Sequence, residues 1–249
     1  MSNALLSGEL MVDNEEDNFV VYLDFNCPFC YALHERMIGL DVLERVSFRN
    51  VQHAPQTSST QVGFETLSKL SSEVAEVARR APSTDINIPM FIPNSGPASS
   101  LVYRVSRRDP AQGRQLRTAL FRALWVDGED ISSPGFLASL VQELGIEVPP
   151  ETAADIDELE KWQLAWGSNQ EFERKIPILI SAKGETVVGF PLEPEVDAFL
   201  KTGSLVSDQL SYGSSSHQKR QWILVLDNDV ASLQMIMQEM HDARVEVVK

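Results

Sequence analysis

The chain has 249 residues, of which 43% are hydrophobic, so it is long and apolar enough for one large domain or two smaller ones with packed cores. It carries 21 Lys and Arg residues against 36 Asp and Glu residues, a net charge of −15. Such an acidic balance disfavours binding to nucleic-acid phosphates and to anionic lipid, so we expect neither a nucleic acid nor a membrane as a partner.

Residues 1–18 are predicted to be an acidic N-terminal extension, because they lack the basic start and the apolar run of a signal peptide. No later stretch approaches the roughly 20 consecutive apolar residues that a membrane span requires. The sequence therefore predicts a cytoplasmic protein.

Residues 19–53 have the pattern of a β-α-β unit. The apolar, β-prone run 19–23 predicts a buried strand, and helical spacing from Pro28 to about Arg45 predicts a helix directly after it. Residues 46–51 predict a second strand, and the crossover between the two parallel strands should be right-handed.

Residues 54–173 are too many for a loop and show mostly helical periodicity, which predicts an inserted helical subdomain. A proline-rich break interrupts it and carries the apolar trio 90–92, for which a buried loop is favoured over an exposed binding lip. Residues 174–201 predict a β-hairpin, with Gly184 supplying the positive φ of its turn, and then a short closing helix.

The only two cysteines, Cys27 and Cys30, lie at the predicted junction between strand and helix, separated by Pro28 and Phe29. Disulfide exchange requires a thiolate that attacks and a second thiol that resolves the mixed disulfide, and this spacing supplies both. Cys27 is the expected nucleophile, because the N-terminus of a helix lowers the pKa of a thiol. Cys30 should be more buried and protonated. Since no histidine separates the cysteines, we expect less thiolate stabilisation than in the strongest oxidants of this kind.

Two other interpretations of the cysteine pair stay open. A zinc site would need two more ligands, and the histidines are scattered along the chain. Two inert core cysteines are the second alternative, although a pair that follows a buried strand and a tight turn is expected to be exposed to solvent. The histidines are His34, His53, His217 and His241.

Three further residues are candidates for this site. Pro177 opens a predicted strand after the helical insertion, and we predict a cis bond between Ile176 and Pro177, with an ordinary trans proline as the alternative. Asp24 precedes Cys27 by three residues and is expected to cap the turn, with a proton relay as the alternative. His53, at the end of the second strand, is ambiguous and is interpreted as a structural residue.

Four segments together resemble the DsbA-like family, and within it the FrnE branch. They are Leu23-Asp24-Phe25-Asn26-Cys27-Pro28-Phe29-Cys30-Tyr31, Pro93-Asn94-Ser95, the 121–146 stretch with Asp130-Ile131-Ser132, and Lys175-Ile176-Pro177. The similarity spans residues 19–200.

This resemblance implies an α/β protein with a thioredoxin fold, in which residues 19–53 and 174–201 form the core and 54–173 a large helical insertion. It implies a dithiol oxidoreductase or isomerase that acts on protein or small-molecule thiols and disulfides. Its redox-active disulfide would need no added cofactor or metal. Cys27 matches the nucleophile and Pro177 the cis-proline, with Cys30 as the resolving thiol. The candidate supporting residues are Asp24, Pro28, Phe29, Asn94 and Ile176.

The same fold also resembles kappa-class glutathione transferases and 2-hydroxychromene-2-carboxylate isomerases, in which a serine typically replaces the nucleophile and glutathione is bound. Cys27 followed by Cys30 favours dithiol exchange, while Asn94 and Ser95 are compatible with either branch. A glutathione-dependent transferase or isomerase is therefore one alternative function. A non-catalytic redox-sensing module of a signalling protein is another.

The C-terminal residues have a separate pattern. Residues 202–219 are rich in Ser and Gly and predict a flexible linker, and 220–249 predict a β-α-β fragment. This fragment resembles the first third of a response-regulator receiver domain, although Asn228 stands where a second magnesium-binding acid is usual after Asp227. It is expected either to continue into a longer signalling protein or to pair with another copy in a homodimer, since its apolar faces are uncovered.

Overall fold

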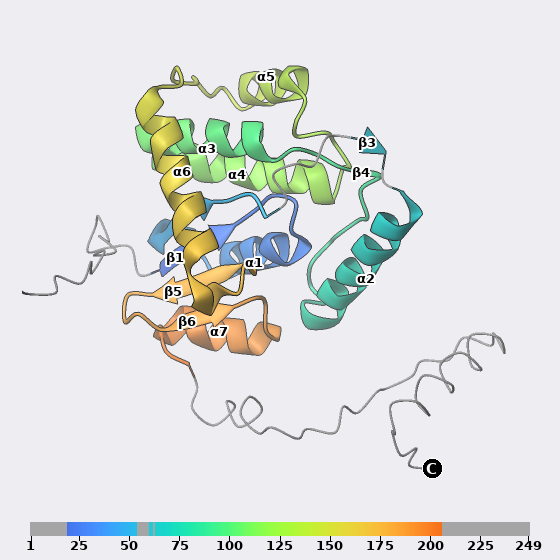
Figure 1. Cartoon of the computed structure of the whole chain (residues 1–249), viewed down its shortest axis with the longest axis vertical. Coiled ribbons are helices and arrows are strands. Elements are labelled where there is room, and N and C mark those ends of the chain that lie inside the picture. Colours follow the sequence, from blue (N-terminus) through green and yellow to red (C-terminus); the bar gives the residue numbers. More distant parts are fainter. Residues whose placement is uncertain (1–18, 54–59, 62, 206–249) are drawn as a thin grey trace, which may run out of the picture. The chain divides into compact units, whose positions relative to one another are not determined.

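The computed structural model describes residues 19–53, 60, 61 and 63–205 (Figure 1). The predicted extension 1–18, most of the linker and the receiver-like segment 220–249 lie outside these residues. The homodimer through the C-terminal segment therefore stays a prediction. Within the described part of the chain, no helix combines the length and the apolar character needed to cross a bilayer.

A four-stranded sheet of order β2-β1-β5-β6 forms the centre of the fold. β1 (Phe19–Leu23) runs parallel to β2 (Val46–Asn50) and antiparallel to β5 (Ile178–Ser181), which in turn pairs with β6 (Thr186–Val188) in a hairpin. The strand before the helical insertion thus lies beside the first strand after it. This mixed α/β architecture confirms a thioredoxin fold with a helical insertion.

Helices cover both faces of this sheet and make up the insertion (Figure 1). The helices are α1 (Pro28–Gly39), α2 (Phe64–Arg80), α3 (Gly96–Arg108), α4 (Pro110–Trp125), α5 (Pro134–Glu143), α6 (Ala153–Ser168) and α7 (Glu193–Thr202), with single 3-10 turns at η1 (Leu43–Arg45) and η2 (Gln170–Phe172).

Alternate residues of β1 enter two different cores, because successive side chains of a strand point to opposite faces. Residues 19, 21 and 23 join the core that contains α1 and α7, where Phe19 packs against Phe199. Val20 and Tyr22 pack on the other face with Trp166 of α6. Both faces of β1 are therefore buried, which explains its continuous apolar sequence.

The helical insertion supports the turn between β1 and α1. Trp125, near the end of α4, is buried and its Nε1 donates a 2.8 Å hydrogen bond to the carbonyl oxygen of Phe25. Phe121, one helical turn earlier, packs on the Phe25 ring with a centroid distance of 4.8 Å. The residues just before the cysteines are thus held by a helix nearly 100 positions away along the chain.

Two predictions about local structure are wrong. The helix expected to reach Arg45 ends at Gly39, because Asp41 adopts a left-handed conformation with φ of 55° and a separate 3-10 turn follows. The trio 90–92 is not a buried loop: Phe91 and Ile92 form β4 (Phe91–Ile92), which pairs with β3 (Thr60–Gln61), and Met90 is 62% exposed.

Candidate active site

Cys27 is the residue at the N-terminal cap of α1. Its backbone N–H donates to the carbonyl oxygen of Asp24 at 3.2 Å, and its own carbonyl accepts from Cys30 and Tyr31, each at 3.1 Å. Pro28 follows in the first helical turn, where a missing N–H leaves no helical bond unmade. Cys27 therefore lies at the positive end of the helix dipole, and Cys30 lies one turn further along α1.

Both cysteines are free thiols and both are buried. Cys30 is 1% exposed, and burial followed by the hydrogen bond and charge of Cys27 raises the pKa of its thiol well above the ordinary value. Cys30 is thus the more buried and the protonated partner, as expected. Cys27 is only 6% exposed, so the expected open exposure of the pair is wrong.

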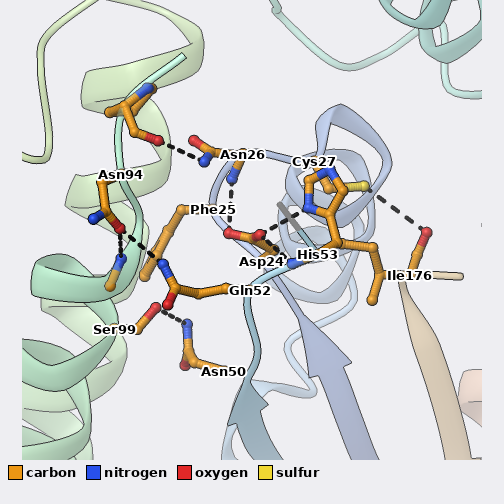
Figure 2. A network of polar contacts seen from close by, with 12 residues as sticks. Asp24, Phe25, Asn26, Cys27, Asn50, Gln52, His53, Asn94, Ser99 and Ile176 are labelled. Carbon is orange, nitrogen blue, oxygen red and sulfur yellow. Dashed lines mark hydrogen bonds and ion pairs between the residues drawn. The ribbon is translucent and has the colours of Figure 1, made fainter. Parts of the chain in front are cut away.

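The loop before β5 lies against Cys27. The Cys27 Sγ is 3.9 Å from the carbonyl oxygen of Ile176 (Figure 2). The peptide bond between Ile176 and Pro177 is cis. The predicted cis bond is confirmed. Trp166 Nε1 donates to the carbonyl oxygen of Lys175 at 2.8 Å and so helps to hold this loop beside the cysteine.

Asp24 is a buried carboxylate at the end of β1. Its Oδ1 accepts from the backbone N–H of Asn26 at 3.2 Å, which is the turn-capping contact that the sequence predicts. Its Oδ2 accepts two further hydrogen bonds, from the backbone N–H of His53 at 2.9 Å and from His53 Nδ1 at 2.7 Å. Asp24 therefore connects the turn before Cys27 with the segment that follows β2.

His53 is the site residue that sequence reasoning missed. Its side chain is 37% exposed and lies near enough to Cys27 for the charge of that thiol to affect it (Figure 2). Burial by itself lowers the pKa of His53, but the hydrogen bond and charge of Asp24, together with the charges of Cys27 and Glu73, outweigh it, so the pKa of His53 is raised. The signal was in the predicted topology, since parallel strands joined by a crossover end at the same edge of a sheet.

Asn94 contacts the segment after β2 and the start of α3. Its Oδ1 accepts from Gln52 Nε2 at 2.8 Å and from the backbone N–H of Gly96 at 2.9 Å, at the start of α3. Its connection to the site is indirect, because the neighbouring Pro93 carbonyl accepts from Asn26 Nδ2 at 2.6 Å. Asn94 thus braces the segment after β2.

Phe29, the second residue between the cysteines, is partly buried against the core. The guanidinium of Arg80 lies 5.9 Å from the centroid of its ring, and Arg80 also donates to the carbonyl oxygen of Phe190 at 2.6 Å. The dipeptide between the cysteines is therefore in contact with α2, and it places no charged side chain of its own beside the thiols.

The described residues hold no group of three or more His, Cys, Asp or Glu side chains that could bind a metal ion. A cavity of about 480 Å³ lies elsewhere, between α3 and α5 in the helical insertion, where Leu101, Arg104 and Leu137 line it. None of the candidate site residues lines this cavity. The chemistry that the arrangement supports is that of two thiols, a carboxylate and an imidazole.

The sequence profile of the DSBA-like thioredoxin domain matches residues 19–165, more than half of the chain. The chain belongs to this family. The matched residues include β1, both cysteines and the helical insertion up to α6. No curated protein matches the chain in sequence.

Solved structures agree with this assignment. A probable DsbA oxidoreductase from Streptomyces coelicolor is 14% identical with a TM-score of 0.57, over 84% of this chain and 94% of that chain. The cytosolic disulfide reductase DsbM from Pseudomonas aeruginosa is 15% identical with a TM-score of 0.54, over 74% and 97%. A 2-hydroxychromene-2-carboxylate isomerase is 16% identical with a TM-score of 0.53, over 79% and 99%. At these identities the similarity shows the shared fold.

Proposed function

We propose that this DsbA-like protein is a thiol-disulfide oxidoreductase in which Cys27 is the nucleophile and Cys30 the resolving thiol. One observation carries the proposal: the Cys27 Sγ, at the N-terminus of α1, lies 3.9 Å from the carbonyl oxygen of Ile176 in the loop that ends in cis-Pro177. The raised pKa of the Cys30 thiol supports its assignment to the second step.

In the reducing direction, the Cys27 thiolate attacks a substrate disulfide, forming a mixed disulfide and releasing one substrate thiolate, which takes up a proton. Cys30 then loses its proton and attacks the Cys27 sulfur, which releases the second substrate thiol and leaves a Cys27-Cys30 disulfide. Two electrons pass from the dithiol to the substrate. The oxidising direction is the reverse of these steps.

The substrate is proposed to be a protein or small-molecule disulfide or thiol that docks along the loop at Ile176 and Pro177. Pro177 is buried and has no N–H to donate to a neighbouring strand, and Ile176 adds a half-buried apolar surface. A FrnE-like subtype and a cytoplasmic location belong to the same proposal. The motif Cys-Pro-Phe-Cys and the cytosolic description of DsbM support them.

Glutathione is the small thiol that we propose as a partner, because one structure of DsbM was determined with GSH. Its role would be to regenerate the Cys27-Cys30 pair. A glutathione-dependent transferase or isomerase is the less favoured function, since Cys30 can attack a mixed disulfide at Cys27 and release the bound thiol. Calorimetry with GSH tests both uses of glutathione, and an absence of binding would contradict each of them.

The test of the main proposal is turnover by the full chain. We expect insulin reduction or dithiol oxidation to disappear in Cys27→Ser and to stop at a trapped mixed disulfide in Cys30→Ser. Leu164→Ala, at a position that is 70% exposed on α6, is the control and should keep full activity. Full activity in Cys27→Ser would refute the proposal. A dithiol that oxidises once without cycling would instead support a redox-sensing module.

A further inference from the structure

We infer that Asp24 and His53 form an acid-base pair for Cys27, in which His53 receives the thiol proton, stabilises the thiolate as an imidazolium and returns the proton to the leaving sulfur. This inference rests on the proposed function of Cys27 as a nucleophile. It assigns to the end of β2 a role that the two residues between the cysteines, Pro28 and Phe29, cannot perform.

The hydrogen bonds define which nitrogen of His53 is available. An ionised Asp24 carboxylate can only accept, so with this charge on Asp24 the 2.7 Å contact places a proton on His53 Nδ1. Nε2 is then the basic nitrogen of the neutral ring. A carboxylate that orients an imidazole through Nδ1 in this way also increases the basicity of Nε2.

The side chain of His53 is held for a reason other than packing. Its backbone N–H already donates to Asp24 Oδ2 at 2.9 Å, so the segment after β2 is tied to the turn without the imidazole. The ring is 37% exposed, so burial alone does not account for its position. A partly exposed ring that is bonded to the buried Asp24, and that lies near enough to Cys27 for the two charges to interact, is placed for chemistry (Figure 2).

Among the described residues, the groups whose charges act most strongly on His53 come from three elements and are acids. Asp24 lies in the turn after β1, Cys27 at the start of α1 and Glu73 on α2, and each favours the imidazolium. Burial opposes them and is outweighed. The net result is a histidine that keeps its proton at higher pH than usual. Its positive charge stabilises a nearby thiolate.

The same pair separates the roles of the two thiols. The imidazolium favours a charge on Cys27, whereas burial, followed by the hydrogen bond and charge of Cys27, raises the pKa of Cys30. During attack on a disulfide, the Cys27–substrate bond forms as the substrate S–S bond breaks, and the proton from His53 passes to the departing thiolate. Because a stabilised thiolate favours the reduced form, the pair also makes the couple more oxidising. The expectation of weak thiolate stabilisation was based on Pro28 and Phe29 alone, and it omits the contribution of the His53 imidazolium.

The pH dependence of iodoacetamide alkylation tests the inference in the full chain carrying Cys30→Ser, where Cys27 is the only thiol. We expect His53→Gln to move the midpoint of the alkylation profile up by about one pH unit, the size of shift that a lost opposite charge produces. Asp24→Asn should move it in the same direction. Thiolate absorbance in the ultraviolet should follow the same order.

His34→Gln is the matched control, since it removes a histidine whose ring bonds to Thr118 and is uncharged at neutral pH, and it should leave the midpoint in place. An unchanged midpoint in His53→Gln would overturn the inference, whether or not Asp24→Asn folds. In the chain with both cysteines, His53→Gln should also lower the reduction potential. Alkylation reports on the thiol without turnover, so a shifted midpoint in a protein that does not turn over would refute the proposed function alone.

Discussion

The two described histidines occupy opposite environments in the same small fold. His53 lies at the edge of the sheet, bonded to a carboxylate, and its pKa is raised. His34 lies on α1 and is 1% exposed, and burial, with added repulsion from Arg117 and Arg122, lowers its pKa to about 3. The comparison shows that neighbouring charges and access to solvent decide whether an imidazole is protonated.

The hydrogen bonds of His34 explain its reluctance to bind a proton. The Thr118 hydroxyl donates to the carbonyl oxygen of Arg114 at 3.0 Å, so it can only accept from His34 Nε2, 2.9 Å away. The proton of the neutral ring is therefore on Nε2. Nδ1 is buried without a hydrogen-bond partner. A second proton there would create a buried positive charge whose N–H has no acceptor.

Phe121 links the two regions and is the position where the largest effect is expected. It is fully buried and stacks on Phe25 beneath the cysteine turn and on His34, with ring centroids 4.8 and 5.1 Å apart. Phe121→Ala should lower the free energy of unfolding by about 3–5 kcal/mol, the usual cost of removing a buried aromatic ring. Urea denaturation measures it, with Phe64→Ala at an 89% exposed position as the control. A loss below 1 kcal/mol would contradict the close packing of the two regions.

Acid should destabilise the protein through His34. Between the unfolded pKa near 6.5 and the folded pKa of about 3, the unfolded chain binds a proton that the folded chain does not, so stability falls as the pH falls. The slope is about 1.4 kcal/mol per pH unit. His34→Leu should flatten the pH dependence of the free energy of unfolding between pH 6 and pH 4. An unchanged slope would mean that His34 is protonated in the folded protein.

His53 should act with the opposite sign. Its folded pKa is raised, so its contribution to stability is complete below the unfolded pKa and is lost as the pH rises through the folded value. The effect should be smaller than that of His34, because solvent screens a ring that is 37% exposed. His53→Gln should therefore remove a small stabilisation at acidic pH, which the same denaturation series detects.

The smallest effect on stability is expected at Arg117, a buried cation whose charge lowers the pKa of His34. Arg117 is 4% exposed, lies 4.1 Å from the centroid of the Phe48 ring and donates to Asn50 Oδ1 at 3.2 Å, and burial lowers its pKa to about 9. Arg117→Met should raise the pKa of His34 while changing stability by about 1 kcal/mol or less, because the lost partner of Asn50 offsets the removed buried charge. Histidine NMR titration measures the shift. A pKa of His34 that stays in place would exclude Arg117 as a cause.

Much of the fold was accessible from local patterns in the sequence. The apolar run of β1, the proline-led helix that carries both cysteines and the strand after Pro177 all follow from residue spacing and backbone preferences, and the structure has them at or near the predicted residues. The end of α1 was misplaced because Leu40 and Leu43 keep a helical spacing although Asp41 leaves the helical conformation. Met90 was misjudged because an apolar trio carries no information about what covers it.

The sequence by itself determined that two thiols stand at the start of a helix and that a proline opens a strand elsewhere, because such features depend on neighbours only a few positions apart. Tertiary structure decided that Ile176 lies against Cys27, that Cys27 is buried and that His53 rather than His34 meets a carboxylate. These outcomes depend on distances between residues far apart in the chain and on access to water, which set the free energy of every charge at the site.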